Sequence, residues 1–345
     1  MLTEVVKINN ISSAEPSITK AAEIIKNGGL VVIPTETVYG LGGNGLLSVS
    51  AEKIYAAKGR PSDNPLIIHI NKPSDAENYA YTNETYYALA KAFMPGPLTV
   101  ILKKKDIVPK TVTGGLETVA IRCPAHPVAR AIINAAGVPI AAPSANISGK
   151  PSPTCAEHVI DDLSGKVDMI IDGGECDIGL ESTIVSIGED NTLTLLRPGG
   201  ITVDALMCVC DTVRIPETIE KSLSENEKPL SPGMKYRHYA PSCPLVLLDG
   251  DEDNIEAFLK EEEKTKKIAI LCYDEETEKY KNSILLPIGK STDVASHAKK
   301  LFSNLREADK FSPDVIYAHI PSKNGLGLAL YNRMIRAAAH TVKKL

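Results

Sequence analysis

The stretch LVVIPTETVYGLGGNG, residues 30–45, runs from an apolar segment straight into a loop rich in glycine and hydroxyl groups. Residues 30–34 have the length and the β-branched content of a buried strand. Loops that follow strands in α/β sheets are common ligand sites, and this loop carries threonines, a glutamate and a tyrosine. A tight turn with capped hydroxyl groups explains the same residues equally well. The stretch therefore indicates an α/β fold and leaves its chemistry open.

Helices and strands alternate on both sides of this stretch. Residues 18–29 (ITKAAEIIKNGG) predict an amphipathic helix that stops at two glycines, and residues 48–59 predict a second helix that ends at Gly59. Short apolar runs predict strands at 65–70, 97–104, 117–124, 138–143, 167–174, 182–188 and 192–199. The last two flank a polar turn and predict an antiparallel hairpin, so we expect a mixed sheet.

The pattern changes in the second half of the chain. From about Asp211 to Pro241 the sequence is charged and poor in apolar residues, which is typical of a linker. Strand and helix patterns then resume to the end of the chain and predict a small three-layer α/β domain of Rossmann-like type. We therefore expect a first domain over 1–210, a linker over 211–241 and a second domain over 242–345.

Composition narrows the functional classes. The net charge of −5 argues against a protein that coats a nucleic-acid duplex, although a local cationic site is compatible with it. Seven cysteines with one close pair, Cys208 and Cys210, favour reduced thiols over a disulfide framework. The N-terminal residues lack the pattern of a leader, and no apolar run is long enough for a membrane span. We expect a cytosolic protein.

Four cations stand at the ends of predicted elements. Lys58 and Arg60 surround the glycine that ends the second helix, while Arg122 and Arg197 end strands. The helix dipole alone favours cations at a helix C-terminus, but two cations around a glycine before a proline-rich loop also suit a phosphate clamp. No Walker A loop or G-x-S-x-G elbow occurs. The cations therefore fit electrostatic catalysis on phosphates better than acyl-enzyme chemistry.

Two further stretches carry polar groups. Ser144 and Asn146 follow a predicted strand in a loop with several prolines, where they serve either ligand recognition or turn formation. The predicted linker contains SPGMKYRHYAP, residues 231–241, with Lys235, Tyr236 and Arg237. A linker without a binding role would not need these residues. They suit a segment that folds over a water-sensitive site, and a basic tether on an acidic surface is the alternative.

Taken in order, the motifs PTETVYGLGGNG, KGRPSDNPL, SAN, STIV and LRPG resemble the YrdC/TsaC family. The K-x-R pair of that family stands here as Lys58 and Arg60, and its S-x-N pair as Ser144 and Asn146. The match covers residues 15 to 205, and the linker with a C-terminal α/β domain is similar to the long, two-domain form of the family.

The resemblance implies a twisted mixed sheet with a concave, positively charged cavity. It also implies an L-threonylcarbamoyladenylate synthase, which makes threonylcarbamoyl-AMP and pyrophosphate from L-threonine, bicarbonate and ATP with Mg²⁺. The product would pass to the tRNA threonylcarbamoyl-transfer machinery, for t6A at position 37 of tRNAs that read codons beginning with A.

The resemblance also implies the site residues. The catalytic residues would be Lys58, Arg60, Ser144 and Asn146. ATP would contact Lys58, Arg60, Ser62, Thr118, Ser144, Ser152, Arg197 and Tyr236, and L-threonine would contact Thr35, His69, Arg122, Ala142 and Ser182. No protein-built metal site is expected, because the sequence offers no carboxylate cluster for one.

Two other functions remain as alternatives. The first is a binding module for double-stranded RNA or tRNA, against which stand the net charge and the absence of aromatic RNA-binding motifs. The second is a carbamoyltransferase that uses carbamoyl phosphate, because a related domain occurs in hydrogenase-maturation enzymes. The acylphosphatase-like and zinc-finger regions expected of those enzymes are not in this sequence.

Overall fold

A computed structural model describes residues 2–219 and 239–345. The chain forms two compact units. The first contains Met1–Ser148 and Ser152–Lys235, and the second contains Gly149–Pro151 and Tyr236–Leu345. Among the described residues, no helix is long and apolar enough to cross a membrane.

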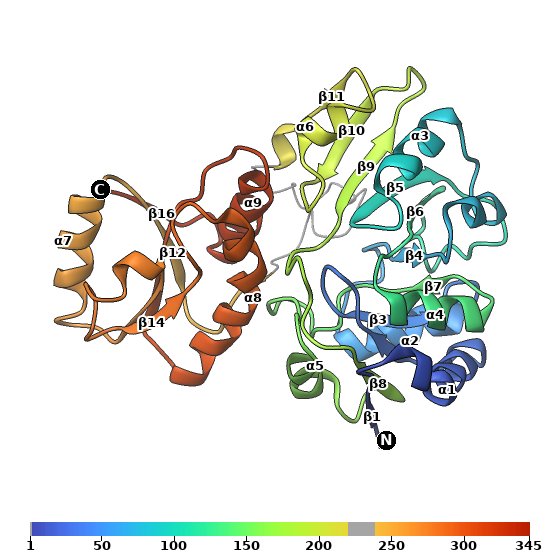
Figure 1. Cartoon of the computed structure of the whole chain (residues 1–345), viewed down its shortest axis with the longest axis horizontal. Helices are drawn as coiled ribbons and strands as arrows, with labels where there is room; N and C mark the ends of the chain where they lie inside the picture. The colour runs from blue at the N-terminus through green and yellow to red at the C-terminus, as the bar shows by residue number, and fades with distance from the viewer. Residues whose placement is uncertain (1, 220–238) are drawn as a thin grey trace. The chain divides into compact units, whose positions relative to one another are not determined.

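The first unit is built on one mixed sheet (Figure 1). Its strand order is β1-β8-β2-β3-β7-β4-β6-β5-β9-β10-β11. The strands are β1 (Glu4–Lys7), β2 (Val31–Ile33), β3 (Gly40–Asn44), β4 (Ile67–His69), β5 (Leu98–Lys103), β6 (Thr118–Arg122), β7 (Ile140–Ala141), β8 (Met169–Asp172), β9 (Thr183–Ile187), β10 (Leu193–Arg197) and β11 (Val213–Arg214). The antiparallel β9–β10 hairpin confirms the expected mixed sheet. Strand β11 lies inside the predicted linker 211–241 and extends the sheet beside β10.

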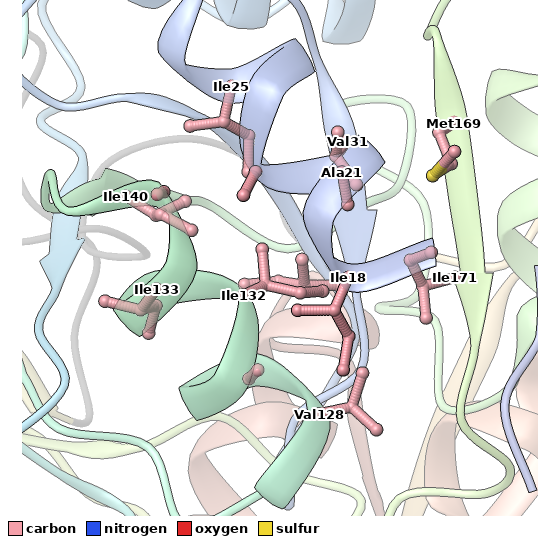
Figure 2. Close-up of a cluster of buried hydrophobic side chains, with 14 of the residues drawn as sticks. Ile18, Ala21, Ile25, Val31, Val128, Ile132, Ile133, Ile140, Met169 and Ile171 are labelled. Atoms are coloured by element: carbon pink, nitrogen blue, oxygen red, sulfur yellow. The ribbon is translucent and has the colours of Figure 1, made fainter. Parts of the chain in front are cut away.

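Six α-helices accompany this sheet in the described part of the first unit. They are α1 (Glu15–Lys26), α2 (Ser48–Lys58), α3 (Glu84–Phe93), α4 (Pro127–Ala136), α5 (Ala156–Leu163) and α6 (Val203–Met207), with 3-10 turns η1 (Ile11–Ser13), η2 (Pro73–Asn78) and η3 (Glu217–Ile219). Figure 2 shows Ile18, Ala21 and Ile25 of α1 against Ile132 and Ile133 of α4. Each fully buried side chain of this kind stabilises the fold by about 1.5–3 kcal/mol.

Most of the glycine-rich part of the opening stretch is a strand, and the interpretation of residues 40–44 as a turn was wrong. Strand β3 pairs antiparallel with β2, with Val31 opposite Gly42. A Cβ atom at Gly42 would lie 2.9 Å from Ile140 Cγ2 and from the Val31 carbonyl oxygen, so the missing side chain is what permits this close packing. The turn itself is confined to the residues between β2 and β3.

The second unit is a parallel five-stranded sheet with the order β14-β13-β15-β12-β16. The strands are β12 (Leu245–Asp249), β13 (Ile268–Cys272), β14 (Ile284–Pro287), β15 (Val315–His319) and β16 (Val342–Lys344). Helix α7 (Glu252–Glu262) covers one face, and α8 (Val294–Phe311) and α9 (Gly327–Ala337) cover the other (Figure 1). A short 3-10 turn, η4 (Asp274–Glu276), follows β13. These layers confirm the expected three-layer α/β unit.

Candidate anion-binding site

Backbone hydrogen bonds join the two polar loops that the sequence singled out. The amide of Leu41 donates to the Pro143 carbonyl at 2.8 Å, and the amide of Ala145 donates to the Tyr39 carbonyl at 2.8 Å. The amide of Tyr39 donates to the Pro153 carbonyl at 2.9 Å. The loop after β2 and the loop after β7 therefore form one rigid structure, although about a hundred residues separate them.

Lys58 ties the K-x-R pair to the S-x-N pair. Its side chain is 2% exposed, and Nζ donates to the carbonyl oxygens of Ser144 and Asn146 at 2.5 Å each. The amide of Ser148 in turn donates to the Lys58 carbonyl at 2.9 Å. A buried ammonium with these partners orders the S-x-N loop and places a positive charge beneath it.

Arg60 holds the loop that follows α2. Its Nε donates to the Asn64 carbonyl at 3.3 Å, and NH2 donates to the Pro65 carbonyl at 3.0 Å. Ser62 lies exposed in the same loop. The arginine thus shapes the proline-rich loop, while the serine points to solvent.

Three side chains lie side by side across neighbouring strands. His69 on β4 is the register partner of Arg122 on β6, and Arg122 is the register partner of Thr99 on β5. Residues in direct register share one face of a sheet. The sheet therefore brings together His69 and Arg122, which the resemblance assigned to L-threonine, and adds Thr99.

Arg122 forms a buried ion pair with Glu36. The distance from Arg122 NH2 to Glu36 Oε1 is 2.7 Å, and both side chains are less than a tenth exposed. Burial alone would raise the pKa of Glu36, but the charge and the hydrogen bond of Arg122 hold that pKa below its usual range. Glu36 is therefore a carboxylate, and Arg122 keeps its charge inside the protein.

His69 is neutral. Burial lowers its pKa to about 3, and the nearby charge of Arg122 acts in the same direction. Its Nδ1 lies 3.2 Å from the Ile67 carbonyl oxygen and 3.3 Å from that of Ile140. Because carbonyl oxygens only accept, Nδ1 carries the proton and Nε2 is left as an acceptor.

Ser182 and Arg197 form a second buried group. Arg197 donates from Nε to the Ser182 carbonyl at 3.0 Å and from NH2 to Ser182 Oγ at 3.1 Å. The Ser182 hydroxyl also lies 2.8 Å from that of Thr99. Thr99 thus links this group to the row that contains Arg122.

The other expected site residues occupy different surroundings. Ser152 is buried and donates to Glu181 Oε1 at 2.6 Å. Thr35 donates to the Val38 carbonyl at 2.6 Å, so its hydroxyl proton serves the turn itself. Thr118 begins β6, at the other end of that strand from Arg122.

Two expected residues remain to be placed. Ala142 is buried, and its amide donates to the Ile67 carbonyl at 2.9 Å. Tyr236 lies outside the described residues, as do Lys235 and Arg237, so the expected closing segment stays a prediction.

Sequence reasoning missed the buried carboxylate of Glu181 and the hydroxyl of Thr99. Glu36 was noted as a polar group of the opening loop but was given no role in the site. The cations Lys58, Arg122 and Arg197 are buried beside these strand-end loops. Buried cations at such loops suit anionic ligands.

The first unit is thus an α/β domain with one mixed sheet and with buried cations beside its strand-end loops. The Sua5_yciO_yrdC family model, described as telomere recombination, matches residues 23–199. The Sua5_C model, described as threonylcarbamoyl-AMP synthase, C-terminal domain, matches residues 201–339. The chain belongs to this family, in the form that carries both domains.

Curated relatives and a solved structure agree with this assignment. The chain is 44% identical to the threonylcarbamoyl-AMP synthase of Bacillus subtilis over 97% of this chain and 96% of the relative. It is 43% identical to that of Pyrococcus abyssi over 94% and 95%. The crystal structure of P. abyssi Sua5 complexed with L-threonine superposes with a TM-score of 0.90 at 42% identity, covering all of both chains.

Proposed function

We propose that the chain is a threonylcarbamoyl-AMP synthase, an enzyme of the nucleotidyltransferase type. It would join L-threonine, bicarbonate and ATP into threonylcarbamoyl-AMP and release pyrophosphate. The observation that carries the proposal is that relatives named for this activity match the chain almost from end to end. The buried cations Lys58, Arg122 and Arg197 support it, because L-threonine contributes a carboxylate and ATP a chain of phosphates.

The reaction needs no covalent nucleophile from the protein. The ammonium group of L-threonine first loses a proton to solvent, and the resulting amine adds to the carbon of bicarbonate with loss of water, which gives N-carboxy-threonine. An oxygen of this carbamate attacks the α-phosphorus of ATP, the bond to the bridging oxygen breaks, and pyrophosphate leaves. The protein must hold two anions close together and offset the charge on the transferring phosphorus.

The row on the sheet supports the L-threonine half of the site. Arg122 would pair with the substrate carboxylate, because a guanidinium fits two carboxylate oxygens. Nε2 of His69 would accept a hydrogen bond from the substrate hydroxyl or ammonium group, which only a neutral imidazole can do. Ser182, Thr35 and Ala142 would complete the pocket.

The loops support the ATP half. Lys58 would act through its charge and by ordering the S-x-N loop, while Arg60 and Arg197 would offset phosphate charge. Further nucleotide contacts are proposed for Ser62, Thr118, Ser144, Asn146, Ser152 and Tyr236. Mg²⁺ would enter on the phosphates of ATP, whose oxygens are ligands that this cation prefers. Among the described residues no group of three or more His, Cys, Asp or Glu could hold a metal ion.

The wider role belongs to the same proposal. The product would supply the threonylcarbamoyl group of t6A in tRNA through a separate transfer machinery, in the cytosol. The division into a catalytic domain over 1–210, a closing linker over 211–241 and a second domain over 242–345 is also proposed, with weak tRNA binding as an additional property.

Mass spectrometry of the reaction products tests this function directly. The protein is incubated with ATP, Mg²⁺, bicarbonate and L-threonine, and each is omitted in turn. We expect threonylcarbamoyl-AMP and pyrophosphate in the complete mixture and neither product when any one substrate is left out. Turnover of carbamoyl phosphate, or salt-dependent RNA binding without ATP turnover, would support the alternative functions instead.

A further inference from the structure

We propose that Glu36 is a positioning residue that holds Arg122 in the orientation needed to bind the carboxylate of L-threonine. This inference rests on the proposed function and adds a residue to it. Glu36 would not touch the substrate itself, and its effect would pass through the guanidinium of Arg122.

Both oxygens of the Glu36 carboxylate are engaged. Oε1 accepts from Arg122 NH2 at 2.7 Å, and Oε2 accepts from the amide of Ala125 at 3.1 Å. The Glu36 carbonyl accepts from the amide of Ile178 at 2.9 Å, which anchors the backbone as well. A carboxylate held at both oxygens and through its backbone has little freedom to turn, so it fixes the NH2 corner of the guanidinium.

The rest of the guanidinium is left available. Nε of Arg122 is buried, and neither it nor NH1 has a hydrogen-bond partner among the described residues. A buried donor without an acceptor is costly, and a bound carboxylate would remove that cost. Glu36 therefore engages NH2 of Arg122 and leaves Nε and NH1 available to an anion.

The position of Arg122 shows where such an anion would lie. The arginine stands in register between His69 and Thr99 on the same face of the sheet. The acceptor Nε2 of His69 and the hydroxyl of Thr99 are the groups that would meet the polar remainder of an amino acid. A guanidinium turned by one rotamer would lose this alignment, which is why its orientation matters.

The test compares the binding of L-threonine with that of L-threoninamide, which lacks the carboxylate, by calorimetric titration of the full chain. In Glu36→Gln we expect L-threonine to bind about tenfold to a hundredfold more weakly. L-Threoninamide and ATP should bind within about twofold of the wild type, because neither uses the Arg122–carboxylate pair. Glu36→Asp, which keeps the charge on a shorter side chain, should lose less than Glu36→Gln. Glu52→Gln, an exposed glutamate on α2, is the matched control and should bind all three ligands normally.

A double variant separates action through Arg122 from a general structural effect. Glu36→Gln combined with Arg122→Gln should bind L-threonine no more weakly than Arg122→Gln alone. An equal loss for L-threonine, L-threoninamide and ATP in Glu36→Gln and Glu36→Asp would overturn the proposal, and so would tighter binding of L-threonine. Since these titrations do not depend on product formation, failure of the proposed synthase reaction would be recognised separately.

Discussion

The neutral state of His69 affects how the free energy of unfolding depends on pH. The folded pKa of about 3 lies below the ordinary value of 6.5, so the unfolded chain binds more protons between these values. The contribution of His69 to the free energy of unfolding is therefore present above pH 6.5 and lost as the pH falls toward 3. We expect the decline in unfolding free energy over this range to become shallower in His69→Gln, measured by urea unfolding at several pH values. An identical pH dependence in both proteins would contradict the assignment.

The tautomer of His69 is open to direct observation. In a spectrum of the protein with ¹⁵N-labelled histidine, Nδ1 should carry the proton and Nε2 should not, and no titration should occur between about pH 5 and 8. A protonated Nε2 at neutral pH would remove its role as an acceptor for L-threonine.

Lys58 offers a second prediction. Lys58→Met keeps most of the side-chain volume but leaves the carbonyl oxygens of Ser144 and Asn146 without the ammonium. Each buried, unsatisfied polar group costs about 1–3 kcal/mol, so the unfolding free energy should fall by at least that amount. ATP affinity should fall strongly while L-threonine affinity stays close to that of the wild type. Lys91→Met on the exposed face of α3 is the control, and equal losses in the two variants would refute the role of Lys58.

At the level of single residues, sequence reasoning identified cations better than their partners. Arg122 and Arg197 stand out because each ends an apolar strand, and strand ends are where α/β sheets carry chemistry. Glu36 and Thr99 acquire their meaning only through contacts with residues more than ten positions away in the chain. Such pairs depend on strand register, which periodicity within one segment does not specify.

At the level of elements, strand β3 shows why a glycine-rich segment misleads. Glycine has low strand propensity, so GLGGN predicts a turn on local grounds. In the folded protein the segment is a strand, and its glycines are needed there because a side chain at Gly42 would collide with Ile140 and with the backbone of β2. The apolar helices and strands were found because their pattern is local, whereas this strand depends on what packs against it.

Gly42→Ala tests that explanation. The added Cβ would come within 2.9 Å of Ile140 Cγ2 and of the Val31 carbonyl oxygen, distances at which something must shift. We expect the unfolding free energy to drop by about 1–3 kcal/mol, as for other overpacked sites. Gly40→Ala is the graded control, since its nearest contact would be Ala142 Cβ at 3.3 Å, and it should cost less. Chemical denaturation of both variants decides the order, and a larger loss for Gly40→Ala would contradict the packing argument.

At the scale of the whole molecule, the chain passes between its compact units at an unexpected place. Sequence reasoning put the boundary in the charged segment after residue 210, where apolar periodicity ends. Gly149–Pro151 nevertheless belongs to the second unit, although Ser148 before it and Ser152 after it belong to the first. A segment of three residues is too short to show a composition or a periodicity of its own, so the sequence pattern could not have identified it.

Arg306 of α8 contacts the segment Gly149–Pro151 within the second unit. Its Nε and NH2 donate to the Pro151 carbonyl at 3.1 and 2.6 Å, and the amide of Ala240 donates to the Gly149 carbonyl at 2.9 Å. A guanidinium that donates two hydrogen bonds to one carbonyl oxygen fixes both the position and the direction of the peptide. Without the guanidinium, the Pro151 carbonyl would lose both of these donors.

Arg306→Ala should therefore lower the free energy of unfolding by about 1–3 kcal/mol, measured by urea unfolding, because the Pro151 carbonyl loses two hydrogen bonds. Arg306→Lys keeps a charge and a donor but not the fork, and its unfolding free energy should lie between those of the alanine variant and the wild type. Lys300→Ala, exposed on the same helix, controls for the loss of a surface charge. An unchanged unfolding free energy in Arg306→Ala would contradict this role of Arg306. A graded loss from wild type through lysine to alanine would show that the paired donors of the guanidinium, and not its charge alone, stabilise the segment Gly149–Pro151, which periodicity in the sequence does not mark as part of the second unit.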